Sequence, residues 1–130
     1  MPRKLTRRES ARDMKQWREH LRSVVARGFS PGARIVAIEG EADLVLVISW
    51  KLGTDLKRPA KRSKTIRLTI EEEALEDYGA APPGQRQLAD TRLEQHLQAQ
   101  LMRFDPDHHT PLGHEPPLVR WSIGTVALLG

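Results

Sequence analysis

The sequence predicts a single-domain α+β fold, with about four strands in a mainly antiparallel sheet and two main helices packed on one face of it. Two long segments repeat apolar residues at helical spacing, and several short segments are rich in β-branched residues or alternate apolar and polar ones. The 130 residues, 38% hydrophobic and 29% charged, are enough for one core. The predicted order is α-β-β-β-α-α-β, over residues 1–130.

The first helix is expected to begin near Thr6. Two overlapping capping patterns, Thr6 with Glu9 and Ser10 with Asp13, indicate a helix start, and residues 1–9 are expected to be flexible. Gly28 is a suitable helix end. Between these points the apolar residues form one stripe, at Met14, Trp17, Leu21, Val24 and Val25.

A hairpin and a third strand follow the first helix. Residues 34–38 and 44–51 are strand candidates, separated by a turn-like segment. The second strand begins apolar on both faces, which favours a central position. Residues 52–62 are too long for a tight hairpin and predict a basic projecting loop. Residues 65–70 alternate cleanly and predict a half-exposed strand.

The remaining segments predict two helices and a last strand. A capping pattern of Thr69 with Glu72 predicts a short helix that reaches Tyr78 and is stopped by Gly79. Residues 85–104 carry a leucine-rich helical stripe. Four prolines make residues 105–117 a loop rich in proline and histidine. Residues 119–123 alternate again and return to the sheet.

The two faces of the predicted sheet differ in character. Trp17, Trp50 and Trp121 fall on apolar stripes and are expected to pack in the core. If the strands pair in the same sense, the face away from the helices is partly polar and available to a ligand or partner. The residues expected there are Ser49, Lys51, Arg67, Thr69, Arg120 and Ser122.

Charge is divided unevenly along the chain. Residues 1–70 hold 17 Lys/Arg and 7 Asp/Glu, whereas residues 71–130 hold 4 and 10. This division indicates a basic face for a polyanion, or a molecule whose halves attract each other. The absence of cysteine excludes disulfides, thiolate metal sites and thiol catalysis. With no apolar run long enough for a membrane span, the expectation is a soluble, cytoplasmic protein.

The strongest functional signal is a run of like charges around the projecting loop. Neutralising phosphates with such groups releases counterions and supplies sequence-independent nucleic-acid affinity. We therefore expect a small non-enzymatic binding protein whose partner is nucleic acid or an acidic protein, if basic loop and helix converge; a solvated or internally paired loop is the plainer alternative. The candidate residues are Lys51, Lys57, Arg58, Lys61, Arg62, Lys64 and Arg67, with Arg12, Lys15 and Arg22 from the first helix.

Two other functions compete with this one. The basic half of one molecule and the acidic half of another favour a protein-interaction or self-assembly module. A metal-dependent enzyme using His108, His109 and His114 is the third hypothesis. Their spacing matches no established metal motif, and a proline-rich loop does not preorganise imidazoles, so we predict no metal, no cofactor and no catalytic residues.

Two features of the chain resemble known proteins. The segments Trp50-Lys51-Leu52-Gly53-Thr54-Asp55 and Lys61-Arg62-Ser63-Lys64-Thr65-Ile66 resemble small bacterial proteins of unknown function, which implies no activity. The order of elements is also similar to that of double-stranded RNA-binding domains, whose second helix offers basic groups to phosphates. Here that position holds Glu71, Glu72 and Glu73, so the family is not adopted. The strands also lack the aromatic residues of an RNA recognition motif.

Overall fold

The computed structural model describes residues 7–53, 57, 60–111 and 113–130, with side chains described from residue 14 onward. Residues 1–6 lie outside this part, and so do the side chains of both capping patterns, Thr6 with Glu9 and Ser10 with Asp13. The elements in chain order are α1 (Arg7–Arg27), β1 (Arg34–Ala37), β2 (Leu44–Ser49), β3 (Thr65–Ile70), α2 (Glu72–Ala80), α3 (Pro83–Met102), β4 (Leu118–Ile123) and α4 (Thr125–Leu129). This order confirms the predicted α+β class and adds a short last helix.

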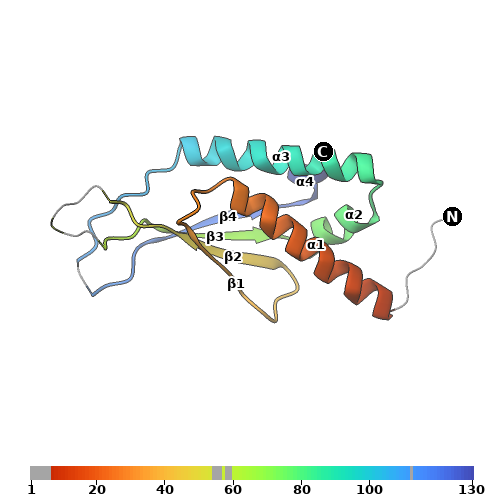
Figure 1. The fold of residues 1–130 in the computed structure, drawn as a ribbon, viewed down its shortest axis with the longest axis horizontal. Helices are drawn as coiled ribbons and strands as arrows, with labels where there is room; N and C mark the ends of the chain where they lie inside the picture. Colours follow the sequence, from red (N-terminus) through yellow and green to blue (C-terminus); the bar gives the residue numbers. More distant parts are fainter. Residues whose placement is uncertain (1–6, 54–56, 58–59, 112) are drawn as a thin grey trace.

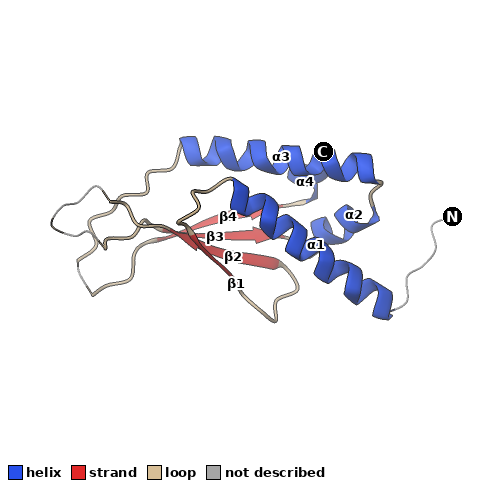
Figure 2. Ribbon diagram, in the orientation of Figure 1, coloured by secondary structure: helices blue, strands red, loops and turns tan. Residues whose placement is uncertain are grey.

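The molecule has two layers, one of strands and one of helices. Figure 1 and Figure 2 show α1 and α3 lying across the same face of the sheet, with α2 and α4 at one end of it. The chain segments on either side of residues 54–56 and 58–59, together with residues 105–111 and 113–117, lie at the other end of the sheet. One sheet face is therefore covered by helices, as predicted, and none of the described helices lies on the other.

The four strands are ordered β1-β2-β3-β4. The β1–β2 and β2–β3 pairs are antiparallel, and β3–β4 is parallel. The sheet is therefore mixed but mostly antiparallel, with β2 and β3 in its centre. The parallel pair follows from the chain path, because α2 and α3 form the long crossover that returns β4 beside β3.

The core lies between the sheet and the helices. Alternate residues of the central strands are fully buried there, including Leu46, Ile48 and Leu68, and they meet Leu21 and Leu97 from the helices. Trp121 is buried, and Trp17 and Trp50 pack against the core, so the predicted interior position of the tryptophans is confirmed.

Long-range contacts change several predicted helix ends. The Thr69–Glu72 capping box does not form; instead the Glu72 N–H donates to Asp43 Oδ1 in the β1–β2 turn, at 2.8 Å. Pro83 begins α3 as its first residue, a position where its missing N–H costs nothing. The helix α2 continues through Gly79 to Ala80, two residues beyond the predicted end.

Gly79 is required by the packing of Trp17 rather than by a helix end. A Cβ at this position would lie 2.9 Å from Trp17 Cδ1, and Trp17 stacks edge-on against Tyr78 and lies beneath the Arg86 guanidinium. We expect Gly79→Ala to lower the free energy of unfolding by about 1 kcal/mol, because the displaced ring outweighs the gain in helix propensity. Urea denaturation measures this change.

Gly84, in the first turn of α3, is the matched control. Nothing lies within 4 Å of the position that a Cβ would take there, so Gly84→Ala should leave stability unchanged or raise it by up to about 1 kcal/mol. Equal effects at both glycines would show that Trp17 adjusts at no cost.

Candidate nucleic-acid interface

The sheet face away from the helices, here called the open face, is rich in cations. Its residues follow from strand alternation and register, because their neighbours in sequence point into the core. None of the described strand residues on this face is acidic. They are Arg34, Val36, Val45, Val47, Ser49, Thr65, Arg67, Thr69, Leu118, Arg120 and Ser122.

Two arginines of the open face are direct neighbours across β3 and β4. Arg67 and Arg120 are register partners, on strands about 4.8 Å apart. Among the described residues, neither guanidinium has a carboxylate within ion-pairing distance. Like charges side by side on a sheet repel each other, so a bound anion between them would relieve an unfavourable interaction.

A second group of cations lies where the open face meets the loops. Arg34 pairs with Ser49 across β1 and β2. Arg62 donates from Nε and Nη2 to Ser49 Oγ at 3.1 and 2.9 Å, which fixes its side chain beside Ser49. Lys51 forms an isolated bridge with Arg62 and is exposed. We call Arg34, Lys51, Arg62, Arg67 and Arg120 the open-face cations.

The other predicted loop cations have different surroundings. The Lys61 ammonium donates to Asp107 Oδ1 at 2.7 Å and is only 13% exposed. This hydrogen bond, followed by one from the His108 N–H, lowers the pKa of Asp107.

Lys57 and Lys61 line a pocket of about 360 Å³ against the 105–117 loop. Lys64 precedes β3, its N–H donating to the Pro106 carbonyl, and Arg58 lies outside the described residues.

The predicted helix cations lie on the helix side of the sheet. Arg22 donates to the carbonyl of Ile35 at 3.1 Å, at the β1 edge. Lys15 lines a pocket of about 160 Å³ between α1 and β1, together with Arg18 and Glu39. The side chain of Arg12 lies outside the described residues. The fold thus places Lys51, Arg62 and Arg67 along the same face of the sheet, and it places Lys15 and Arg22 on the other side.

Some basic residues of the first half of the chain contact acidic residues of the second half within the molecule. Two ion pairs join a base from residues 1–70 to an acid from residues 71–130, Arg27–Glu94 and Lys61–Asp107, and His20 contacts Asp90 in the same way. None of these pairs involves an open-face cation. The internal attraction of the two halves therefore leaves the charge of the open face available.

Sequence reasoning did not select Arg34 and Arg120 as binding residues. Most of the predicted binding residues belong to the run of like charges between Lys51 and Arg67, which is one stretch of sequence. Arg34 and Arg120 reach the open face from strands that are distant in sequence from this run. Alternation of β4 placed Arg120 on this face, but only the parallel register with β3 puts it beside Arg67.

The histidine loop has a structural role at His108. Its Nε2 lies 2.9 Å from the Arg62 carbonyl, and its Nδ1 accepts a hydrogen bond from the Thr110 N–H at 3.3 Å. These contacts define a neutral tautomer that connects the two loops. Within the described residues, no group of three His, Asp or Glu side chains is arranged to hold a metal.

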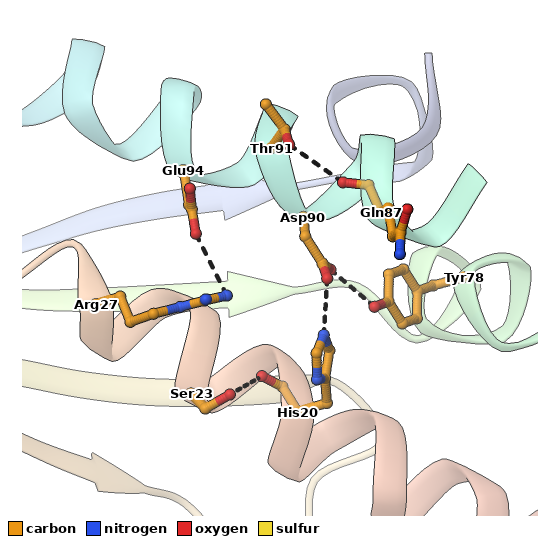
Figure 3. Close-up of polar contacts among 8 residues, drawn as sticks. All are labelled: His20, Ser23, Arg27, Tyr78, Gln87, Asp90, Thr91 and Glu94. Atoms are coloured by element: carbon orange, nitrogen blue, oxygen red, sulfur yellow. Dashed lines mark hydrogen bonds and ion pairs between the residues drawn. The ribbon is translucent and has the colours of Figure 1, made fainter. Parts of the chain in front are cut away.

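A separate polar cluster joins three helices (Figure 3). Asp90 of α3 accepts a hydrogen bond from the Tyr78 hydroxyl at 2.8 Å and lies 2.8 Å from His20 Nε2. Burial, and then the hydrogen bond to Asp90, raise the pKa of Tyr78. The nearby Ser23 hydroxyl donates to the His20 carbonyl rather than to the ring. The cluster contains a His–Asp pair but no hydroxyl nucleophile positioned by it, and its role is to connect α1, α2 and α3.

Comparison with known proteins gave no lead to a family. No protein-family model, curated protein or solved structure matches the chain. Among the helices that the structure describes, none is long and apolar enough to cross a membrane.

Proposed function

We propose that this protein binds nucleic acid without sequence preference, through phosphate contacts on the open face. One observation carries the proposal: five cations from the strands and the adjoining bridge share a face on which no described strand residue is acidic. Cations that neutralise phosphates release condensed counterions, and this release supplies most nonspecific affinity.

The chemistry of the face suits a phosphate backbone better than a set of bases. The aromatic side chains that stack on bases in sheet-based RNA readers are absent from the described strand residues of this face. The guanidinium groups of Arg34, Arg67 and Arg120 remain able to form paired hydrogen bonds to phosphate oxygens. Serine and threonine hydroxyls between them add neutral donors.

A salt series with labelled oligonucleotides tests the proposal. We expect binding of single-stranded and duplex DNA and RNA at low ionic strength, measured by fluorescence anisotropy. With up to five phosphate contacts on a single strand, the slope of log affinity against log salt should approach about −3 to −4. Undetectable binding at low salt, or affinity that does not vary with salt, would reject nucleic acid as the ligand.

A further inference from the structure

The two outer edges of the sheet differ in whether side chains hydrogen-bond to their backbone groups. At the β1 edge, Arg22 donates to the Ile35 carbonyl at 3.1 Å. Arg18 donates to the carbonyls of Glu41, Ala42 and Asp43 in the adjoining turn. The edge strand is also short, at four residues. A side chain from α1 therefore occupies the outward Ile35 carbonyl, an acceptor that an incoming strand would need, and another covers the adjoining turn.

The β4 edge has six residues and no comparable cover among the described residues. The Thr65 N–H donates to the Pro117 carbonyl and the Glu71 N–H to the Ile123 carbonyl, so the odd-numbered residues of β4 face β3. In a parallel ladder the even-numbered residues then direct their N–H and C=O groups away from the sheet. For Leu118, Arg120 and Ser122, no backbone hydrogen bond to any described residue is made at this edge.

The side chains along this edge favour a partner strand that carries negative charge. Leu118 is 47% exposed, and Arg120 and Ser122 are also exposed. Antiparallel pairing of two copies centred on Arg120 would place two arginines directly opposite each other, which is unfavourable. A carboxylate at that position would instead neutralise Arg120, whose neighbour Arg67 also lacks an anionic partner among the described residues.

We infer that the free edge of β4 binds an extended acidic peptide as a fifth strand, with carboxylates at alternate positions beside Arg120. Backbone hydrogen bonds to Leu118, Arg120 and Ser122 would supply affinity, and the arginine would supply specificity. This inference can fail separately from the proposed nucleic-acid binding, because a phosphate backbone does not need the edge N–H groups, although both ligands would use Arg120.

The probe for this site is an acetylated, amidated peptide in which valine and glutamate alternate, with a lysine-for-glutamate peptide as its control. NMR hydrogen exchange of the full chain measures protection of the Arg120 and Ser122 amides. We expect protection by the glutamate peptide and roughly tenfold weaker binding of the lysine peptide. No protection at saturating peptide, or equal binding of both peptides, would overturn the inference. Protection of these amides by self-association without peptide would also overturn it.

Two variants locate the interaction. Ser122→Pro removes one outward N–H without touching the β3–β4 ladder, so it should abolish peptide binding while Ser122→Ala retains it. Neither change alters charge, so the slope of log nucleic-acid affinity against log salt should stay the same in both, which separates this proposal from the previous one. Arg120→Glu, which does not constrain the backbone, should reverse the preference and bind the lysine peptide more tightly. An unchanged preference would contradict the assigned role of Arg120.

Discussion

Replacing both Arg67 and Arg120 by glutamate is expected to weaken nucleic-acid binding by roughly ten- to a hundredfold at low salt. The two residues are register partners on β3 and β4, so reversal turns a paired phosphate site into a pair of carboxylates that repels phosphate. The salt slope should also become shallower by about 1.5, since two contacts no longer release counterions. Anisotropy titrations over a salt series measure both quantities.

The matched control is Lys15→Glu with Arg22→Glu, on the helix side of the sheet. Both double variants reduce the net charge equally, so any difference between them reports the position of the ligand rather than total charge. At about 0.1 M salt we expect only a small loss for the control, because exposed charges more than a Debye length of roughly 10 Å away are then largely screened. An equal or larger loss in the control would place the interface at α1 and contradict the open face.

The sequence predicts the open face well because strand alternation is a local property. Residues such as Arg67 and Arg120 alternate with buried neighbours within a few positions, so their side of the strand can be read without knowing the fold. Which cations become neighbours depends on register between distant strands, and sequence does not encode that register locally. Arg34 was not predicted as a binding residue, because its position beside Ser49 depends on the register between β1 and β2.

Contacts between segments far apart in sequence also explain why two lysines of the same charged run have different surroundings. Lys51 and Lys61 belong to one run of charge in the sequence, yet Lys61 is paired with Asp107, which lies 46 residues away, and Lys51 is exposed at the open face. The capping of α2 by Asp43 and the contact of Gly79 with Trp17 are also contacts between segments far apart in sequence. Local patterns predicted a helix in that region, but neither the hydrogen bond to Asp43 at its amino end nor the packing of Trp17 on Gly79.

The second large effect is expected at the cluster that joins three helices. Asp90→Ala should lower the free energy of unfolding by about 2 to 3 kcal/mol, because it leaves the hydroxyl of Tyr78, a residue only 1% exposed, without its acceptor and His20 without its partner. Asp90→Asn keeps a carbonyl oxygen for the Tyr78 hydroxyl and should cost less. Urea denaturation of the two variants measures the difference. Equal losses would show that the negative charge of Asp90, rather than hydrogen bonding to Tyr78, stabilises the cluster.

The pH dependence of stability at alkaline pH tests the contribution of Tyr78, the only tyrosine in the chain, to the same cluster. Burial and Asp90 raise its pKa in the folded state above the ordinary 10.0, so the folded protein retains a proton that the unfolded chain loses. This contribution to stability is complete below about pH 10 and declines as the pH rises further, by up to about 1.4 kcal/mol per pH unit. Tyr78→Phe should remove that part of the decline. Absorbance titration of the phenolate should give a folded-state pKa above that of the urea-unfolded chain, and an identical pKa in both states would show that the hydroxyl is not held by Asp90.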